Sequence, residues 1–514
     1  MLDRWHLENT SQGAKSCIIL GEAPELLVKH ELEKYSQVLW LIDNDFQCSF
    51  TNIQTFCLKD LDSEDFKESL QLFIAKDYHS IPDTKSYKSL NPIWNQVLET
   101  INLNFECSKS ARRTRSEDGL LRQINIFQNL PDYLISKIDD RWKNSLEKTL
   151  SVVVGAGPSL DLTLPILKKW KIPFNLIATD SSIRALNHFD LKPDFVLSID
   201  PNKCVQSCAD YDFNDGILIA CNTTHKSWLE RWKNNTMMIS GPIIFEDWLE
   251  KNGIEKAEVQ AINNVGLSSI SFANFLGCEV LMLIGMDLAS GLDHSRYAVV
   301  TQRDQNLIPY GTKQYEIPGN FNKKVKTTFI SDWKDTSNFC KQIAEKLQII
   351  NLNDRGAVLE GALLIHPSSA MELEETLSNF IEQKTNPLDL INRYQSKPQN
   401  LDFIFEKIFK AIDRAWFYIE NNSQQEESFE SKQYDCIRKI MTDSDLPSIM
   451  GDYSFAVMPL LISNEMPSKE ILETIINNLK MLLWKLEDAL IQLPVSNKLM
   501  AQFLTENLIN SSEI

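Results

Sequence analysis

The chain has 514 residues and carries 70 acidic against 52 basic side chains, which gives a formal net charge of −18. This acidity argues against a nucleic-acid-binding protein, because such proteins neutralise phosphates with basic faces. The longest apolar runs, such as residues 280–284, are far shorter than a membrane span, and residues 1–6 contain no apolar signal core. Ten scattered cysteines do not suggest a disulfide framework. We therefore expect a cytoplasmic protein that binds neither nucleic acid nor a membrane.

Residues 1–125 predict a small N-terminal α/β domain. An apolar run at residues 16–20 ends in Gly21, a helical pattern follows, and a second apolar run covers residues 38–42. This order is the outline of a βαβ unit. A further apolar run at residues 72–75 predicts another strand.

Residues 126–375 predict a Rossmann-like catalytic domain. Short apolar runs alternate there with helical segments, at residues 151–154, 176–178, 195–199, 216–220, 237–239, 280–284 and 347–350. Near-continuous apolar strands covered by helices indicate a doubly wound, mainly parallel sheet. In such sheets a ligand binds beyond the carboxyl ends of the strands, where the strand order reverses.

The first of these strands is followed by a glycine-containing loop with Gly155, Gly157, Pro158 and Ser159. Glycines let a backbone turn tightly and approach a phosphate, and the next helix offers unpaired N–H groups to it. Ser159 could cap that helix, which Pro158 would enter. The alternative is that the glycines serve only the turn.

Carboxylates follow the next two strands. Asp180 and Ser181 come after the second strand, and Asp200 comes after the third. Such groups could accept ribose or sugar hydroxyls, or hold a divalent metal ion through oxygen ligands. A single Asp after a strand also commonly caps a helix. Together these strand ends predict a site for a ligand of nucleotide or sugar size, with metal dependence left open.

Residues 376–514 predict an all-helical domain. Two apolar stripes with helical spacing run through residues 401–419 and 471–490, and the second ends before Pro494. The predicted fold class is therefore α/β, with a doubly wound Rossmann-like sheet flanked by a small N-terminal α/β domain and a helical C-terminal domain.

Several segments of the chain, in order, resemble the motility accessory factor family. They are residues 152–161 (VVVGAGPSLD), 178–186, 191–201, 277–289 with His294 behind them, 325–327 and 360–361. The resemblance covers about half of the chain. It implies a bacterial glycosyltransferase that moves a nonulosonic acid, pseudaminic or legionaminic, from a CMP-activated donor to Ser or Thr of flagellin. The family's central domain is similar to CMP-dependent sialyltransferases and to MptE-like 6-hydroxymethylpterin diphosphokinases.

The resemblance implies a set of site residues. His294 is the candidate base, since imidazole titrates near neutral pH, although it could be an ordinary loop histidine. Lys326 and Thr327 could stabilise the departing phosphate, although Lys326 lies in a lysine-rich stretch that could be a solvated face. Asp287 could orient the acceptor or the base, or cap a helix. Asn264 could contact the donor base, or begin the next helix.

Two segments depart from the family pattern. Met286 stands where the family commonly has Gln, and a thioether cannot replace the donor and acceptor of an amide. Residues 353–357 replace a run closer to Thr-Glu-Gly-Gly. These differences leave open a non-catalytic protein that binds flagellin or assists its export. A 6-hydroxymethylpterin diphosphokinase is a third possibility.

An acidic protein needs local positive charge to bind an anionic nucleotide sugar. Lys203, Arg296, Lys324 and Lys326 lie close to the predicted motifs in the sequence. We expect these cations to supply that charge.

Overall fold

The structure is a computed structural model whose chain divides into two compact units, Met1–Thr114 and Arg115–Ile514. In the first unit it describes residues 6–9, 16–42, 53–57 and 83–86, with scattered single residues and pairs between 63 and 102. In the second it describes residues 116–210, 213–302, 306–378, 381, 384–393, 400–420, 429–462 and 466–511. The units are described separately below.

The first unit contains a five-stranded sheet. Its strands, in spatial order, are β1 (His6–Asn9), β5 (Asp83–Ser86), β2 (Ser16–Leu20), β3 (Gln37–Ile42) and β4 (Ile53–Cys57). Strands β2 and β3 are parallel and are joined through helix α1 (Glu25–Leu32), which confirms the predicted βαβ unit. The prediction of a strand at residues 72–75 is wrong at Phe73, which is the residue of this run that the structure describes. Phe73 is helical, and a short apolar run alone cannot distinguish a strand from a buried helix.

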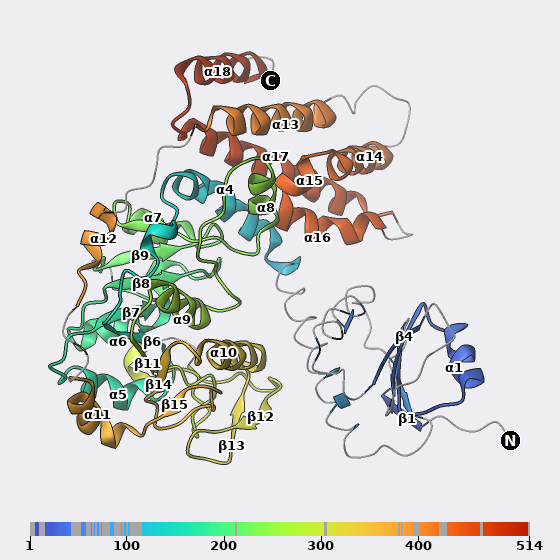
Figure 1. Cartoon of the computed structure of the whole chain (residues 1–514). Coiled ribbons are helices and arrows are strands. Elements are labelled where there is room, and N and C mark those ends of the chain that lie inside the picture. The colour runs from blue at the N-terminus through green and yellow to red at the C-terminus, as the bar shows by residue number, and fades with distance from the viewer. Residues whose placement is uncertain are drawn as a thin grey trace. The chain divides into compact units, whose positions relative to one another are not determined.

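The second unit is built on an eight-stranded parallel sheet (Figure 1). Its strands, in spatial order, are β10 (Thr236–Met238), β9 (Ile217–Ala220), β8 (Phe195–Ser198), β7 (Asn175–Thr179), β6 (Leu150–Val154), β11 (Val280–Ile284), β14 (Gln348–Asn351) and β15 (Leu363–Leu364). All seven predicted strands are present. A separate hairpin pairs β12 (Tyr315–Pro318) with β13 (Lys324–Thr327) in antiparallel register.

Helices cover both faces of this sheet. Alternate strand residues point to opposite sides, so that Val152 and Leu176 pack on one face while Val153 and Ile177 pack on the other. The first face packs against α4 (Gly119–Ile135), α5 (Leu160–Leu167), α6 (Ile183–His188), α7 (Lys226–Arg231), α8 (Ile244–Lys251) and α11 (Ala370–Leu377), and the second against α9 (Val265–Leu276) and α10 (Ile330–Ile343). The predicted doubly wound fold is therefore confirmed.

The chain ends in helices, as predicted. They are α12 (Pro387–Arg393), α13 (Asp402–Glu420), α14 (Phe429–Thr442), α15 (Leu446–Ile449), α16 (Gly451–Ile462), α17 (Lys469–Ile491) and α18 (Asn497–Ser511). The short 3-10 helices are η2 (Asp140–Trp142), η3 (Asp180–Ser182), η4 (Val205–Ser207), η5 (Val299–Thr301) and η6 (Pro367–Ser369). Among the described helices, none is both long and apolar enough to cross a membrane.

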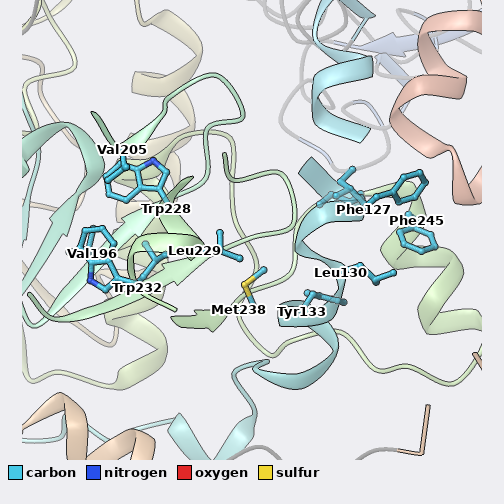
Figure 2. Packing of buried hydrophobic residues seen from close by; sticks show 14 of the residues in the cluster. Phe127, Leu130, Tyr133, Val196, Val205, Trp228, Leu229, Trp232, Met238 and Phe245 are labelled. Atoms are coloured by element: carbon cyan, nitrogen blue, oxygen red, sulfur yellow. The ribbon is translucent and has the colours of Figure 1, made fainter. Parts of the chain in front are cut away.

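One hydrophobic core joins the sheet to the terminal helices. Figure 2 shows part of it, where Phe127 of α4 meets Phe245 of α8 edge-on, with ring centres 5.8 Å apart. Trp228 and Trp232 stack at 5.6 Å beside Val196 of the sheet. The same cluster of buried residues continues into α13, α16 and α17. Residues 126–375 and 376–514 thus share a core, and their separation as domains stays a prediction.

Candidate functional site

The strand order of the large sheet reverses between β6 and β11. From β6 the chain adds β7, β8, β9 and β10 on one side, whereas β11, β14 and β15 lie on the other side. The carboxyl ends of β6 and β11 therefore flank the switch point at which α/β sheets bind ligands. The loops that follow these two strands carry Gly155–Ser159 and Gly285–Asp287.

The glycines of these loops permit two backbones to pack directly against each other. The N–H of Gly155 donates to the carbonyl of Ile284 at 2.8 Å, and the N–H of Gly157 donates to the carbonyl of Gly285 at 2.7 Å. A Cβ atom on Gly157 would collide with the Asp287 carboxylate and lie 2.8 Å from the Gly285 oxygen. The glycines therefore do more than form a turn: they allow close contact between the loops at the switch point.

Ser159 joins the two loops through its side chain. Its backbone N–H and its hydroxyl lie 3.0 and 2.8 Å from Oδ2 of Asp287, and the hydroxyl is also 2.7 Å from Oδ1 of Asn353. Ser159 occupies the N-cap position of α5 but makes no side-chain cap. The expected helix cap is therefore wrong, because the hydroxyl is oriented instead toward Asp287 and Asn353.

Asn353 is a residue of this cluster that the sequence reasoning did not select. Its Oδ1 accepts the N–H of Gly285 at 2.8 Å, and its Nδ2 donates to Oδ1 of Asn351 at 2.6 Å. Asn353 follows β14, so it connects a third strand end to the switch point. The only signal in the sequence was its place in the segment that departs from the family pattern.

Asp287 supplies the carboxylate of the cluster and is buried, with 1% of its surface exposed. Burial raises its pKa to about 7, although the bonds from Ser159 oppose that rise. Its Oδ1 atom is buried without a hydrogen-bond partner. A loop follows Asp287 rather than a helix, so the helix-cap alternative does not apply. Near neutral pH this carboxyl can therefore exist in both protonation states.

Asp180 and Asp200 meet at a lysine. Nζ of Lys203 lies 3.3 Å from Oδ1 of Asp180, 3.6 Å from Oδ2 of Asp200 and 3.3 Å from the hydroxyl of Ser181. Burial disfavours the charge of Lys203, but Asp180 and Asp200 outweigh it and raise the pKa of the ammonium. These two carboxylates are thus already neutralised by a cation, and their fit to a divalent metal is poor. No group of three or more metal-binding side chains occurs among the described residues.

Three other predicted residues are placed as follows. The side chain of Asn264 caps α9 by accepting the N–H of Leu267 at 2.8 Å. The hydroxyl of Thr327 donates to the carbonyl of Leu288 at 2.7 Å and accepts the N–H of Phe329 at 2.8 Å. It therefore already acts as both a donor and an acceptor within the protein. Lys326 is exposed on β13. Their contacts with a donor molecule stay a prediction.

His294 lies exposed in the loop between β11 and η5, with a positive φ of 64°. The loop is held against the glycine loop, because the N–H of Ala298 donates to the carbonyl of Ala156 at 2.9 Å. Pro158, which belongs to the glycine loop, is buried. The structure therefore brings the loops of His294, Ser159 and Asp287 together at the carboxyl ends of β6 and β11.

Met286 packs between the glycine loop and α9, because its sulfur would lie 2.8 Å from a Cβ atom placed on Gly155. It is 4% exposed and belongs to the core on the α9 side of the sheet. Its sulfur would meet a Cβ atom placed on Gly266 at 2.9 Å, so the thioether fills the space that this glycine leaves. The departure from the family pattern at this position is accommodated by packing.

A solved structure of a MAf glycosyltransferase from Magnetospirillum magneticum AMB-1 is similar over 98% of this chain and 83% of that chain, with a TM-score of 0.51 and 14% sequence identity. The chain has the fold of a Maf glycosyltransferase. Residues 124–291 also match the family model described as 6-hydroxymethylpterin diphosphokinase MptE-like. No curated protein matches the sequence. The likeness to the Maf structure extends beyond the central motifs, and at the level of the fold it confirms the resemblance seen in the sequence.

Proposed function

We propose that the protein is a cytoplasmic glycosyltransferase that moves a nonulosonic acid, pseudaminic or legionaminic, from a CMP-activated donor to Ser or Thr of flagellin. The observation that carries this proposal is the meeting of the loops after β6 and β11 at the switch point of a sheet with the Maf fold. The sequence motifs that resemble the family supply these loops.

In the proposed reaction the bond between the anomeric carbon and the phosphate oxygen breaks, and CMP leaves with the electron pair. The hydroxyl oxygen of the acceptor forms the new bond to the anomeric carbon, and its proton passes to a base. His294 is the proposed base because its loop is exposed and is held against the glycine loop. Asp287 is buried and bonded to Ser159, so it suits a role in positioning the loops.

The test is a transfer assay with CMP-pseudaminic or CMP-legionaminic acid and purified flagellin. We expect flagellin to gain the mass of the sugar, and we expect His294→Gln to reduce the rate by at least about 100-fold, as for loss of a general base. Flagellin binding without any gain of mass would contradict catalysis and support the accessory-protein alternative.

The match of residues 124–291 to the diphosphokinase model favours one alternative, a 6-hydroxymethylpterin diphosphokinase. Calorimetric titration with CMP and with ATP separates the two functions. The glycosyltransferase proposal predicts tighter binding of CMP. A clear preference for ATP, together with transfer of its terminal diphosphate to the pterin alcohol and release of AMP, would establish the alternative.

A further inference from the structure

The four cations near the predicted site differ in what already neutralises them. Lys203 is paired with Asp180 and Asp200. Lys324 is exposed and paired with Glu316 at 3.0 Å. Lys326 is exposed to water on the same hairpin. Arg296 differs from all of these, because it is half-buried and no carboxylate among the described residues pairs with it.

Aromatic rings hold the guanidinium of Arg296 in place. Its central carbon lies 5.1 Å from the centre of the Phe329 ring and 5.4 Å from that of the Tyr297 ring. Its Nε atom is buried and has no hydrogen-bond partner. Rings attract a cation but cannot accept its N–H bonds in the plane of the guanidinium. The guanidinium of Arg296 is therefore held in one orientation and partly dehydrated, and its Nε–H donor has no acceptor.

The backbone around Arg296 places it beside the glycine loop. Its N–H donates to the carbonyl of Asn306 at 2.7 Å, and two residues later Ala298 bonds to Ala156 of the glycine loop. Phe329 immediately precedes α10. The backbone of the loop that carries Arg296 is thus bonded to the glycine loop, while the guanidinium packs against Phe329 just before α10.

We propose that Arg296 is the residue that binds the phosphate of the nucleotide at the switch point. This inference rests on the proposed function and adds a recognition residue to it. A planar guanidinium forms paired bonds with phosphate oxygens, which lysine cannot do. Of the four cations, Arg296 is the one that is both dehydrated and free of a carboxylate, so an oxyanion supplies the missing partner. The acidity of the chain as a whole does not oppose binding, since exposed charges further away are screened.

The test is calorimetric titration of the full-length protein with CMP, cytidine, inorganic pyrophosphate and free pseudaminic or legionaminic acid. We expect Arg296→Gln to weaken CMP and pyrophosphate binding by at least about 10-fold and to leave cytidine unchanged. Arg296→Lys keeps the charge but loses the planar pair of donors. We therefore expect this variant to restore the binding of CMP and pyrophosphate only in part. Lys323→Gln removes an exposed cation that lies just before β13 and has no proposed role in binding; it is the matched control and should behave as wild type.

Each other outcome is decisive. Equal weakening of CMP and cytidine, or no weakening of either, would overturn the assignment of phosphate to Arg296. Dependence on Arg296 that appears only with the free nonulosonic acid would assign the residue to the sugar carboxylate instead. Binding of pyrophosphate through Arg296 without any binding of CMP would retain the anion site and refute the CMP-dependent function. Thermal unfolding of each variant, with an unchanged midpoint, shows that the chain still folds.

Discussion

At the scale of single residues, the protonation of Asp287 couples the site to stability. Burial raises its pKa to about 7, whereas an unfolded chain releases this proton near a pKa of about 3.9. The folded state therefore binds the proton more tightly. The stabilisation is complete below about pH 4 and is lost as the pH rises through about 7.

Asp287→Asn keeps the shape of the side chain but removes the titrating carboxyl. We therefore expect it to remove this dependence of the stability on pH. The free energy of unfolding of the wild type relative to the variant should fall by up to about 1.4 kcal/mol per pH unit between about pH 5 and 7, and then level off. Denaturant unfolding of both proteins at matched pH measures the difference. Burial also raises the pKa of Glu246 and Asp332, but both remain in the variant and cancel. A difference that does not change with pH would contradict the expectation.

Gly157 tests the close approach of the two loops. In Gly157→Ala the new methyl group collides with Asp287 and with the Gly285 carbonyl, neither of which can move freely. We expect a loss of about 1–3 kcal/mol of stability, as for overpacking. In the control, Gly266→Ala, the methyl group meets the flexible end of Met286, so the loss should be smaller. Thermal unfolding compares the two, and an equal loss in both would argue against a special role for Gly157.

The sequence placed the loops of this site correctly but not their bonds. Periodicity located β6 and β11, and hence Ser159 and Asp287 at their carboxyl ends. It could not show that Ser159 reaches Asn353, because residues 194 positions apart in the chain meet only through the order of the strands. For the same reason, the sequence could not show that the ammonium of Lys203 pairs with Asp180.

At the scale of elements, helix α4 connects the sheet to the terminal helices. Two of its buried side chains bond to loops at the carboxyl ends of strands. Nδ2 of Asn125 donates to the carbonyls of Pro201 and Thr223. Nδ2 of Asn129 donates to those of Asn222 and Thr224, at 3.0 and 2.7 Å. The helix thereby fixes the loops after β8 and β9.

We expect Asn129→Leu to destabilise the protein by about 1–3 kcal/mol, because it leaves buried carbonyls without donors. Gln128→Ala is the matched control, since this neighbouring amide is half-buried and makes no comparable bond. Denaturant unfolding compares the two variants with the wild type. A smaller loss of stability for Asn129→Leu than for Gln128→Ala would show that the bonds from Asn129 to these two carbonyls do not stabilise the protein.

Helix α4 was not predicted from the sequence, although it lies at the centre of the fold. Its buried face contains amides where a helical stripe would be apolar, and Pro131 lies inside the helix. Asn and Pro both have low helix propensity. The helices α13 and α17 were predicted because their buried faces are apolar throughout. Polar residues that are buried for tertiary bonds thus hide an element from pattern analysis.

At the scale of the whole molecule, the division into parts follows the hydrophobic cores. The first unit has separate cores on the two sides of its own sheet. In the second unit, one cluster includes the sheet residue Val152, Phe127 of α4 and Leu483 of α17. The apolar patterns along the sequence suggested three domains, but only contacts between distant segments determine which of them share a core.

This arrangement predicts how deletions behave. Removal of residues 401–514 takes away α16 and α17, which pack against α4 and share its hydrophobic core. Exposure of such a surface costs roughly 25 cal/mol per Å² and favours aggregation. A chain of residues 115–400 should therefore lack a cooperative thermal transition, whereas residues 115–514 should unfold at the midpoint of that unit in the full-length protein. Scanning calorimetry with size-exclusion chromatography measures both. A cooperative transition at the same midpoint for residues 115–400 would show that the sheet with its own helices is a complete folding unit, and that the terminal helices were added to a core that did not need them.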